Sequence, residues 1–357
     1  MRKFTLSIKQ KHAKRIEATT SNLKGFLLPA VLLVFMGLML AFPTHYFEGT
    51  KKGLAIFSSS VLPAIFPFAF LSTLMAKTEV VKDVSKAFEK PFRFLFGVSN
   101  YGAFVLFSAL ICGYPVGAVT TFELYNKGLI STEEAKSYIP ISSTASPIFI
   151  LATVGGALFE DMTVGVIILL SHYLGTFLNG ILWGLVNKSR GKLEKGAEDK
   201  NAGSVGALSE HMRVRARVQN NNNENLVGDA VVKSVSSMLV VGGYLVLFGL
   251  VVDTLELLPF ANSLPYSVKG ILYSFVEMSR GVAMARSVSA KWFAVAIATF
   301  AVTFGGLSVN LQNYHYLSMC NCSLKEVILP KFSQGILGFL CAIIFSIIFF
   351  NIFGIKG

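Results

Sequence analysis

The segment with the clearest chemical potential is a glycine- and proline-rich run at the end of an apolar block. Its sequence is Gly113-Tyr114-Pro115-Val116-Gly117. Glycine and proline together interrupt a helix and leave backbone N–H and C=O groups without partners. Within a bilayer such groups are tolerated only where protein buries them or a wet cavity receives them, and they then offer dipole ends to a ligand. All of these residues except the valine are therefore candidate binding residues.

Two more polar clusters suggest the same chemistry. The first lies between two prolines and is rich in hydroxyls, and the second joins a glycine pair to side-chain amides. Their candidate binding residues are Ser142, Ser143, Ser146 and Pro147 in the first, and Gly305, Gly306, Ser308, Asn310 and Gln312 in the second. Hydroxyl and carboxamide groups recognise a polar solute through hydrogen bonds. Small residues also let transmembrane helices pack closely, and this alternative stays open for each residue taken singly.

Charged residues within apolar segments are functional candidates in a membrane protein. Glu123 lies one or two turns beyond the first glycine break and is an ion-coupling candidate. Glu277 and Arg280 are three positions apart on a predicted helix and could simply pair with each other. His172 lies inside a predicted span, where a packing histidine is the simpler interpretation and a proton relay the alternative.

The chain has none of the short motifs that indicate an enzyme. Walker A, His-Glu-x-x-His, Gly-x-Ser-x-Gly and Cys-x-x-Cys patterns are all missing from the sequence. We therefore expect no enzyme, with no catalytic residue, no metal site and no cofactor.

Long apolar blocks must position the candidate residues. Of the 357 residues, 53% are hydrophobic and 15% are charged, whereas charged residues make up about 25% of soluble domains. Several blocks have the length that a helix needs to cross a bilayer. The main apolar blocks are residues 25–42, 53–76, 101–118, 162–186, 230–252, 290–304 and 335–350, with a shorter block at 148–159 that could be re-entrant. The predicted fold is an all-α polytopic transmembrane helix bundle, with lipid around it, in a multi-pass cell-membrane protein.

The net charge of +12 does not indicate a nucleic-acid partner. The basic residues lie beside apolar blocks, as at Arg2, Lys9 and Arg15, which is the pattern of cytoplasmic flanks under the positive-inside rule. We therefore expect the N-terminus inside and no nucleic acid. Pro63 and Pro67 predict a kink or break in the second block.

The chain divides into two halves around a polar stretch. We expect a basic cytoplasmic N-terminus (1–24), a first transmembrane helix with an outer loop (25–52), a first repeat (53–187), a flexible linker (188–228) and a second repeat (229–357). Gly113 lies 192 positions before Gly305, and Ser131-x-x-Glu134 matches Ser323-x-x-Glu326 at the same offset. Both serine–glutamate patterns predict a capping box. The repeats are inverted if 140–159 is re-entrant and parallel if it crosses fully.

Three segments resemble a known family. They are Leu110 to Ala118 around the glycine break, Leu129 to Ala135 with the capping box, and Ser146 to Gly155 after the proline, and the second half adds Gly306 to Gln312. The chain resembles the YlbJ family of sporulation integral membrane proteins, which belongs to the nucleoside-recognition, or Gate, group. The resemblance implies a role in spore formation, in the mother-cell membrane, and similarity to the gate region of concentrative nucleoside transporters. The group's name does not by itself establish nucleoside binding.

Two functions from different classes are therefore expected. The leading hypothesis is a transporter-like protein that moves a small polar solute, such as a nucleoside-like one, bound between the two repeats and released by their rocking. The rival is a non-transporting scaffold for spore-envelope assembly, which would use the linker and the basic N-terminus. A homo-oligomer is compatible with both hypotheses.

Overall fold

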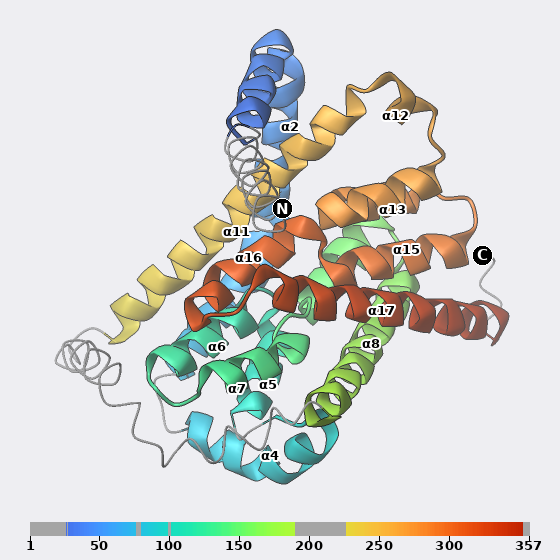
Figure 1. Ribbon diagram of the computed structural model, residues 1–357. Coiled ribbons are helices and arrows are strands. Elements are labelled where there is room, and N and C mark those ends of the chain that lie inside the picture. Colours follow the sequence, from blue (N-terminus) through green and yellow to red (C-terminus); the bar gives the residue numbers. More distant parts are fainter. Residues whose placement is uncertain (1–25, 27, 76–79, 99–100, 190–225, 353–357) are drawn as a thin grey trace, which may run out of the picture. The chain divides into compact units, whose positions relative to one another are not determined.

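The computed structural model describes the chain apart from residues 1–25, 27, 76–79, 99–100, 190–225 and 353–357 (Figure 1). The basic N-terminus and nearly all of the linker lie outside the described residues. Within the described ranges the chain is helical and contains no strand. The prediction of an all-α fold is confirmed.

The chain forms two compact units, residues 1–50 and residues 51–357. In the first unit the helix Leu28–Ala41 is followed by the start of α2 (Pro43–Ile56), and the ring of Phe35 packs edge-on against Tyr46 at 5.9 Å between centroids. The predicted outer loop after the first span is therefore wrong, because α2 starts at Pro43. Proline suits the first position of a helix, since its missing N–H would have no intrahelical partner there.

Among the residues that the structure describes, five helices are long and apolar enough to cross a membrane. They are Pro43–Met75, Met162–Lys188, Leu226–Glu256, Lys291–Cys320 and Leu324–Phe350. The first joins α2 to α3 (Leu62–Met75) through a π-helical segment, Phe57–Val61. Pro63 and Pro67 do not break this span, and the widened turn just before Pro63 eases the clash between its ring and the preceding carbonyl. The protein is a multi-pass membrane protein, as predicted.

Two helical hairpins are too short to cross. One consists of α5 (Gly102–Cys112) and α6 (Val116–Asn126), and the other of α13 (Tyr266–Val276) and α14 (Met278–Arg286). Each of their helices has between 9 and 11 residues, about half of a transmembrane helix. The prediction of a span over 101–118 is therefore wrong, because α6 folds back on α5 after the glycine break.

Two long segments are helices with a break. The first consists of α7 (Thr132–Tyr138), the short 3₁₀ turn Ile139–Ile141, the non-helical residues 142–146 and the π-helical segment Phe149–Leu158. The second consists of α15 (Lys291–Phe304) and α16 (Gly306–Leu317), separated by Gly305 in the left-handed conformation. The predicted capping boxes are confirmed at the starts of α7 and of α17 (Leu324–Ile352), with the predicted reciprocal hydrogen bonds.

Three long helices surround the second broken segment. α8 (Met162–Ser189) and α17 pack against each other, and both pack against α15, while α11 (Leu226–Glu256) packs on α3 (Figure 1). The side chains of α15 are almost all buried from Ala294 to Phe304. This packing holds the break at Gly305 in the interior of the second unit.

Candidate functional site

Glycines let the tip of the α5–α6 hairpin contact the first broken helix. Gly113 has φ 83°, and a Cβ on it would lie 2.9 Å from the backbone nitrogen of Ser146. A Cβ on Gly117 would overlap the carbonyl of Ser142. Thr144 donates from its hydroxyl to the carbonyl of Ala109 at 2.5 Å, which also joins the first broken helix to α5. Close packing is thus one role of these glycines.

The tip of the α13–α14 hairpin holds a buried carboxylate. Glu277 is 2% exposed, and its Oε2 accepts from the hydroxyl of Ser279 at 2.5 Å and from the backbone N–H of Arg280 at 2.9 Å. The expected side-chain pair between Glu277 and Arg280 is not formed, because the Arg280 guanidinium pairs with Asp253 at 2.9 Å. Glu277 therefore caps α14 and stays on the inner side of the hairpin tip.

The break in the second broken helix lies directly beneath that tip. Gly305 and Gly306 have φ 80° and 66°, and a Cβ on Gly306 would lie 3.0 Å from the carbonyl oxygen of Val276. Asn310 donates from Nδ2 to the carbonyls of Phe304 at 3.0 Å and Gly306 at 2.6 Å. Its amide thus replaces helix hydrogen bonds that the break removes.

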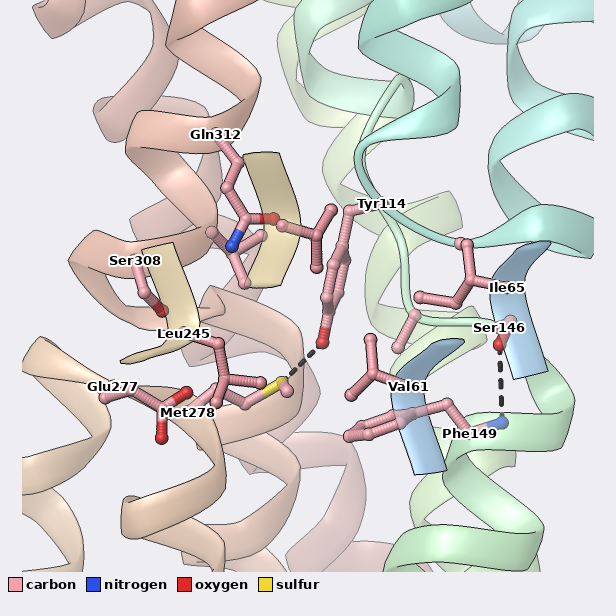
Figure 2. A pocket seen from close by; sticks show the side chains of 14 residues that line it. Val61, Ile65, Tyr114, Ser146, Phe149, Leu245, Glu277, Met278, Ser308 and Gln312 are labelled. Carbon is pink, nitrogen blue, oxygen red and sulfur yellow. Dashed lines mark hydrogen bonds between the residues drawn. The ribbon is translucent and has the colours of Figure 1, made fainter. Parts of the chain in front are cut away.

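The two hairpin tips and the two breaks enclose one small pocket (Figure 2). Polar groups from both halves reach it from Gly113, Tyr114, Ser146, Glu277, Ser308 and Gln312, and the apolar lining includes Val61, Ile65, Phe149, Leu245 and Met278. The Tyr114 hydroxyl donates to the sulfur of Met278, so the two tips contact each other across the pocket. The free volume is about 30 Å³, which is enough for about two waters.

Gln312 is the polar residue of this pocket that lacks a partner. Its side chain is 3% exposed, and its Oε1 has no hydrogen bond in the structure. Leaving a buried acceptor unpaired costs about 1–3 kcal/mol, so such a group indicates a place where a bound molecule would be favoured. Glu277 lines the same pocket, and its acidic side chain has no basic partner among the lining residues.

The predicted binding residues divide into two groups. Gly113, Tyr114, Ser146, Ser308 and Gln312 line the pocket. The other candidates do not line it, namely Pro115, Gly117, Ser142, Ser143, Pro147, Gly305, Gly306 and Asn310. Five of the thirteen predicted binding residues thus line the pocket, and their role in binding stays a prediction.

Two predicted charged or titratable candidates lie elsewhere. Glu123 is on α6 and pairs with Lys233 at 3.0 Å, away from the pocket lining. His172 is fully buried, with Nε2 accepting from the backbone N–H of Ala145 at 2.9 Å. Because Nε2 accepts, Nδ1 carries the proton and donates to Thr303 at 2.9 Å. His172 is thus a hydrogen-bonded packing histidine, as the simpler interpretation predicted.

Sequence reasoning did not place Glu277 and Met278 in the site. The sequence feature that could have indicated Glu277 is its position in the middle of a mixed apolar segment, because an acidic residue away from the membrane surface is a candidate functional residue. Among the described residues, no group of three or more His, Cys, Asp and Glu side chains could hold a metal ion.

Comparison with known proteins gives one clear relative. Neither a protein-family model nor a solved structure matches this chain. The sporulation integral membrane protein YlbJ of Bacillus subtilis (strain 168) is 27% identical over a match of 335 residues, and the match covers 88% of this chain and 81% of that protein. A match of this extent includes residues of both halves. The resemblance to the YlbJ family predicted from the sequence is thereby confirmed: this chain is a relative of a sporulation integral membrane protein along most of its length.

Proposed function

We propose that this protein is a transporter-like membrane protein of the Gate type, which acts in spore formation and moves a small polar solute. The role in spore formation rests on the similarity to YlbJ, whose name describes a sporulation protein. The transport function rests mainly on the pocket between the two hairpin tips, where both halves contribute polar groups and Gln312 has a buried, unpaired oxygen. Binding sites in secondary transporters lie at such interfaces between repeats.

The two halves are proposed to be repeats with a spacing of 163 to 164 residues, in place of the 192 expected from the glycine breaks. Gly117 and Gly281 are 164 positions apart, and each lets the returning helix of its hairpin approach the outgoing one. Gly175 and Gly338 are 163 positions apart and lie against each other where α8 and α17 cross. On this spacing the α5–α6 hairpin corresponds to the α13–α14 hairpin, and residues 142–146 correspond to the break at Gly305.

Ion pairs at one end of the helices support an inverted arrangement. Lys291 at the start of α15 pairs with Asp161, which directly precedes α8, at 3.0 Å. Arg286 at the end of α14 pairs with Glu160 at 2.8 Å. The starts of α8 and α15 and the open end of the α13–α14 hairpin therefore share one membrane face.

A second set of ion pairs joins other ends. Lys136 on α7 pairs with Glu326 in the first turn of α17 at 3.4 Å, and Glu123 pairs with Lys233 near the start of α11 at 3.0 Å. Since α15 and α16 lead from the first face toward the start of α17, these ends share the opposite face. α8 and α17 then run in opposite directions, as in an inverted repeat. The linker between α8 and α11 would be cytoplasmic, on the same face as the basic helix α4 (Val80–Phe96).

The pocket has the chemistry of a site for donor-bearing solutes. Glu277 and the oxygen of Gln312 are acceptors, and the hydroxyls of Ser146 and Ser308 can accept or donate. A solute with N–H or O–H groups, neutral or positively charged, would satisfy these acceptors. A volume of about 30 Å³ holds no such solute, so the structure corresponds to a closed state in which the Tyr114–Met278 contact must open for entry.

The direct test combines metabolite profiling with matched variants. Wild-type and deletion cells are compared during spore formation to identify the solute that accumulates or disappears. That solute is then offered to purified protein reconstituted in vesicles, as wild type, Glu277→Gln, and the control Glu123→Gln, whose residue lies outside the pocket. We expect transport by wild type and the control, and a loss of at least about tenfold in Glu277→Gln, since one charge-assisted hydrogen bond contributes about 1.5–3 kcal/mol. Normal transport by Glu277→Gln would contradict the proposed site.

The scaffold hypothesis makes the opposite prediction for the linker. Deletion of residues 191–225, which the structure does not describe, should leave a transporter largely active. A scaffold that recruits envelope proteins through this segment should fail to support spore formation although the protein is present at normal levels. A sporulation defect with intact solute transport would favour the scaffold.

The inverted topology has its own test. Glu160→Cys and Lys233→Cys place single reactive thiols on the two proposed faces, in a background where the native cysteines, which are buried, are replaced. A membrane-impermeant thiol reagent should label Glu160→Cys in intact cells and Lys233→Cys only after permeabilisation. Labelling of both from outside would rule out the proposed arrangement.

A further inference from the structure

A lysine lies fully buried beside the first broken helix. Lys331 is on α17, within the span Leu324–Phe350, and is 1% exposed. Its ammonium group donates to the backbone carbonyl of Ser143 at 3.0 Å and to Oε1 of Gln334 at 2.9 Å. Among the residues that the structure describes, no acidic side chain pairs with Lys331.

The partners of this ammonium group belong to a helix break. Ser143 lies in the non-helical residues 142–146. Its carbonyl also receives Nε2 of Gln334 at 3.4 Å, and its hydroxyl accepts from Nδ2 of Asn313 at 2.8 Å. Gln334 in turn donates to Thr176 of α8 at 2.6 Å. Side chains of α16 and α17 thus bond to Ser143 directly, and α8 joins this network through Gln334.

The charge of the group agrees with the polarity of the break. The carbonyl ends of a helix carry partial negative charge, and the short helical segment 132–141 ends at Ile141, two residues before Ser143. In transporters with broken helices, unwound carbonyls and helix C-terminal ends are the groups that coordinate a coupling cation. The carbonyl of Ser143 is a group of this kind. The cation that contacts it is the ammonium group of Lys331, which is covalently part of α17.

We propose that Lys331 is a tethered cation, whose ammonium group takes the place of a bound inorganic cation at the break of the 132–158 helix and fixes that break to α17. The protein then needs no sodium, lithium or potassium ion to hold this segment. This inference concerns a contact outside the solute pocket, since neither Lys331 nor Ser143 lines the pocket.

The test measures the melting temperature of the purified full-length protein in detergent, using the fluorescence of its two tryptophans. Wild type is compared in sodium, lithium, potassium and choline chloride at equal ionic strength, and we expect melting temperatures that agree within about 1 °C. Lys331→Ala should melt at least about 5 °C lower in choline, because Oε1 of Gln334 and the carbonyl of Ser143 each lose the hydrogen bond from Lys331. Methylammonium, which fits the space left by the shortened side chain, should restore part of this loss.

Two further variants separate the effect of the Lys331 charge from the effects of lost volume and of removing a lysine elsewhere. Lys331→Met fills the space without a charge and should be destabilised without recovery in methylammonium. Lys233→Ala removes a partly exposed lysine and should leave the melting temperature near that of wild type. Wild type stabilised by sodium, lithium or potassium over choline would overturn the proposal, as would Lys331→Met as stable as wild type. If neither Lys331 variant can be purified, the comparison of cations on wild type decides. Because stability is measured, this result does not depend on the proposed transport.

Discussion

Gly175 of α8 and Gly338 of α17 lie backbone against backbone where the two helices cross. A Cβ built on Gly175 would be 2.7 Å from the nitrogen and 2.8 Å from the Cα of Gly338. Close helix crossings of this kind are typical of small residues in membrane bundles, where packing and not hydrophobicity drives association. The two glycines also occupy equivalent positions in the proposed repeat, so the crossing would lie near the axis that relates the halves.

The first prediction concerns this crossing. Gly175→Ala should destabilise the protein by about 1–3 kcal/mol, because neither backbone can move away from the new methyl group without repacking α15. Gly243→Ala is the matched control, since a Cβ at Gly243 has no atom within 4 Å and alanine favours helix. Melting temperatures in detergent measure both. If Gly175→Ala melted together with the control, the close contact of α8 with α17 would be in error.

The second prediction separates stability from function at Gln312. Its buried oxygen has no partner, so Gln312→Leu should leave the melting temperature unchanged or raise it slightly while solute transport is lost. The measurement pairs a melting curve with uptake into vesicles. A variant that is both less stable and fully active would show that Gln312 serves packing and not binding.

The sequence predicted the breaks at Gly113 and Gly305 because they have local causes. Gly113 and Gly305 adopt positive φ, which glycine allows at little cost, and Ser131 and Ser323 form their caps with residues three positions away. Such signals are complete within a few residues. These glycine and capping patterns predicted where helices begin and end, and they indicated the region in which the pocket lies.

The partners of those breaks could not be predicted in the same way. Gly113 and Gly305 both end an apolar helix, and this similarity suggested a repeat in which they occupy equivalent positions. In the structure Gly113 is at a hairpin tip, whereas Gly305 is within a broken helix. Each arm of the α13–α14 hairpin is too short to appear as a span, which hid the position of Glu277. Lys331 follows a polar stretch in the sequence, and only the packing of α17 against α8 makes it buried.

The third prediction concerns Asn310, which the sequence placed in the binding site. Its Nδ2 bonds to the carbonyls of Phe304 and Gly306, so Asn310→Ala should lower stability by about 2–3 kcal/mol and reduce the amount of protein in the membrane. Asn310→Asp should do the same, because a carboxylate cannot donate to carbonyls. Membrane levels measured by immunoblot, beside Asn321→Ala at a more exposed position, check this. If Asn310→Ala were present at normal levels but did not transport, the result would support a role for Asn310 in binding.

The last prediction uses the ion pair between Asp161 and Lys291 at the start of α8. Partial burial opposes ionisation of Asp161, but the hydrogen bond from Lys291 and the backbone N–H of Thr163 outweigh it, and the pKa of Asp161 is lowered. A carboxyl group whose pKa is lower in the folded state stabilises that state above its unfolded pKa of about 4, and this contribution is lost as the pH falls through the folded value. Asp161→Asn can keep the hydrogen bond to Thr163 but not the charge.

Wild type should therefore melt above Asp161→Asn at pH 7, by an amount that corresponds to about 1 kcal/mol, and the difference should shrink steadily below pH 4. Glu160→Gln is the matched control, because its pair with Arg286 has a carboxylate that is 69% exposed and solvent weakens such pairs. Its melting temperature should equal that of wild type at pH 7. Melting curves over this pH range measure all three proteins. A difference between wild type and Asp161→Asn that persists unchanged at pH 3 would mean that Asp161 acts through its shape and not through its charge, and the pair with Lys291 would then have no part in joining α8 to α15.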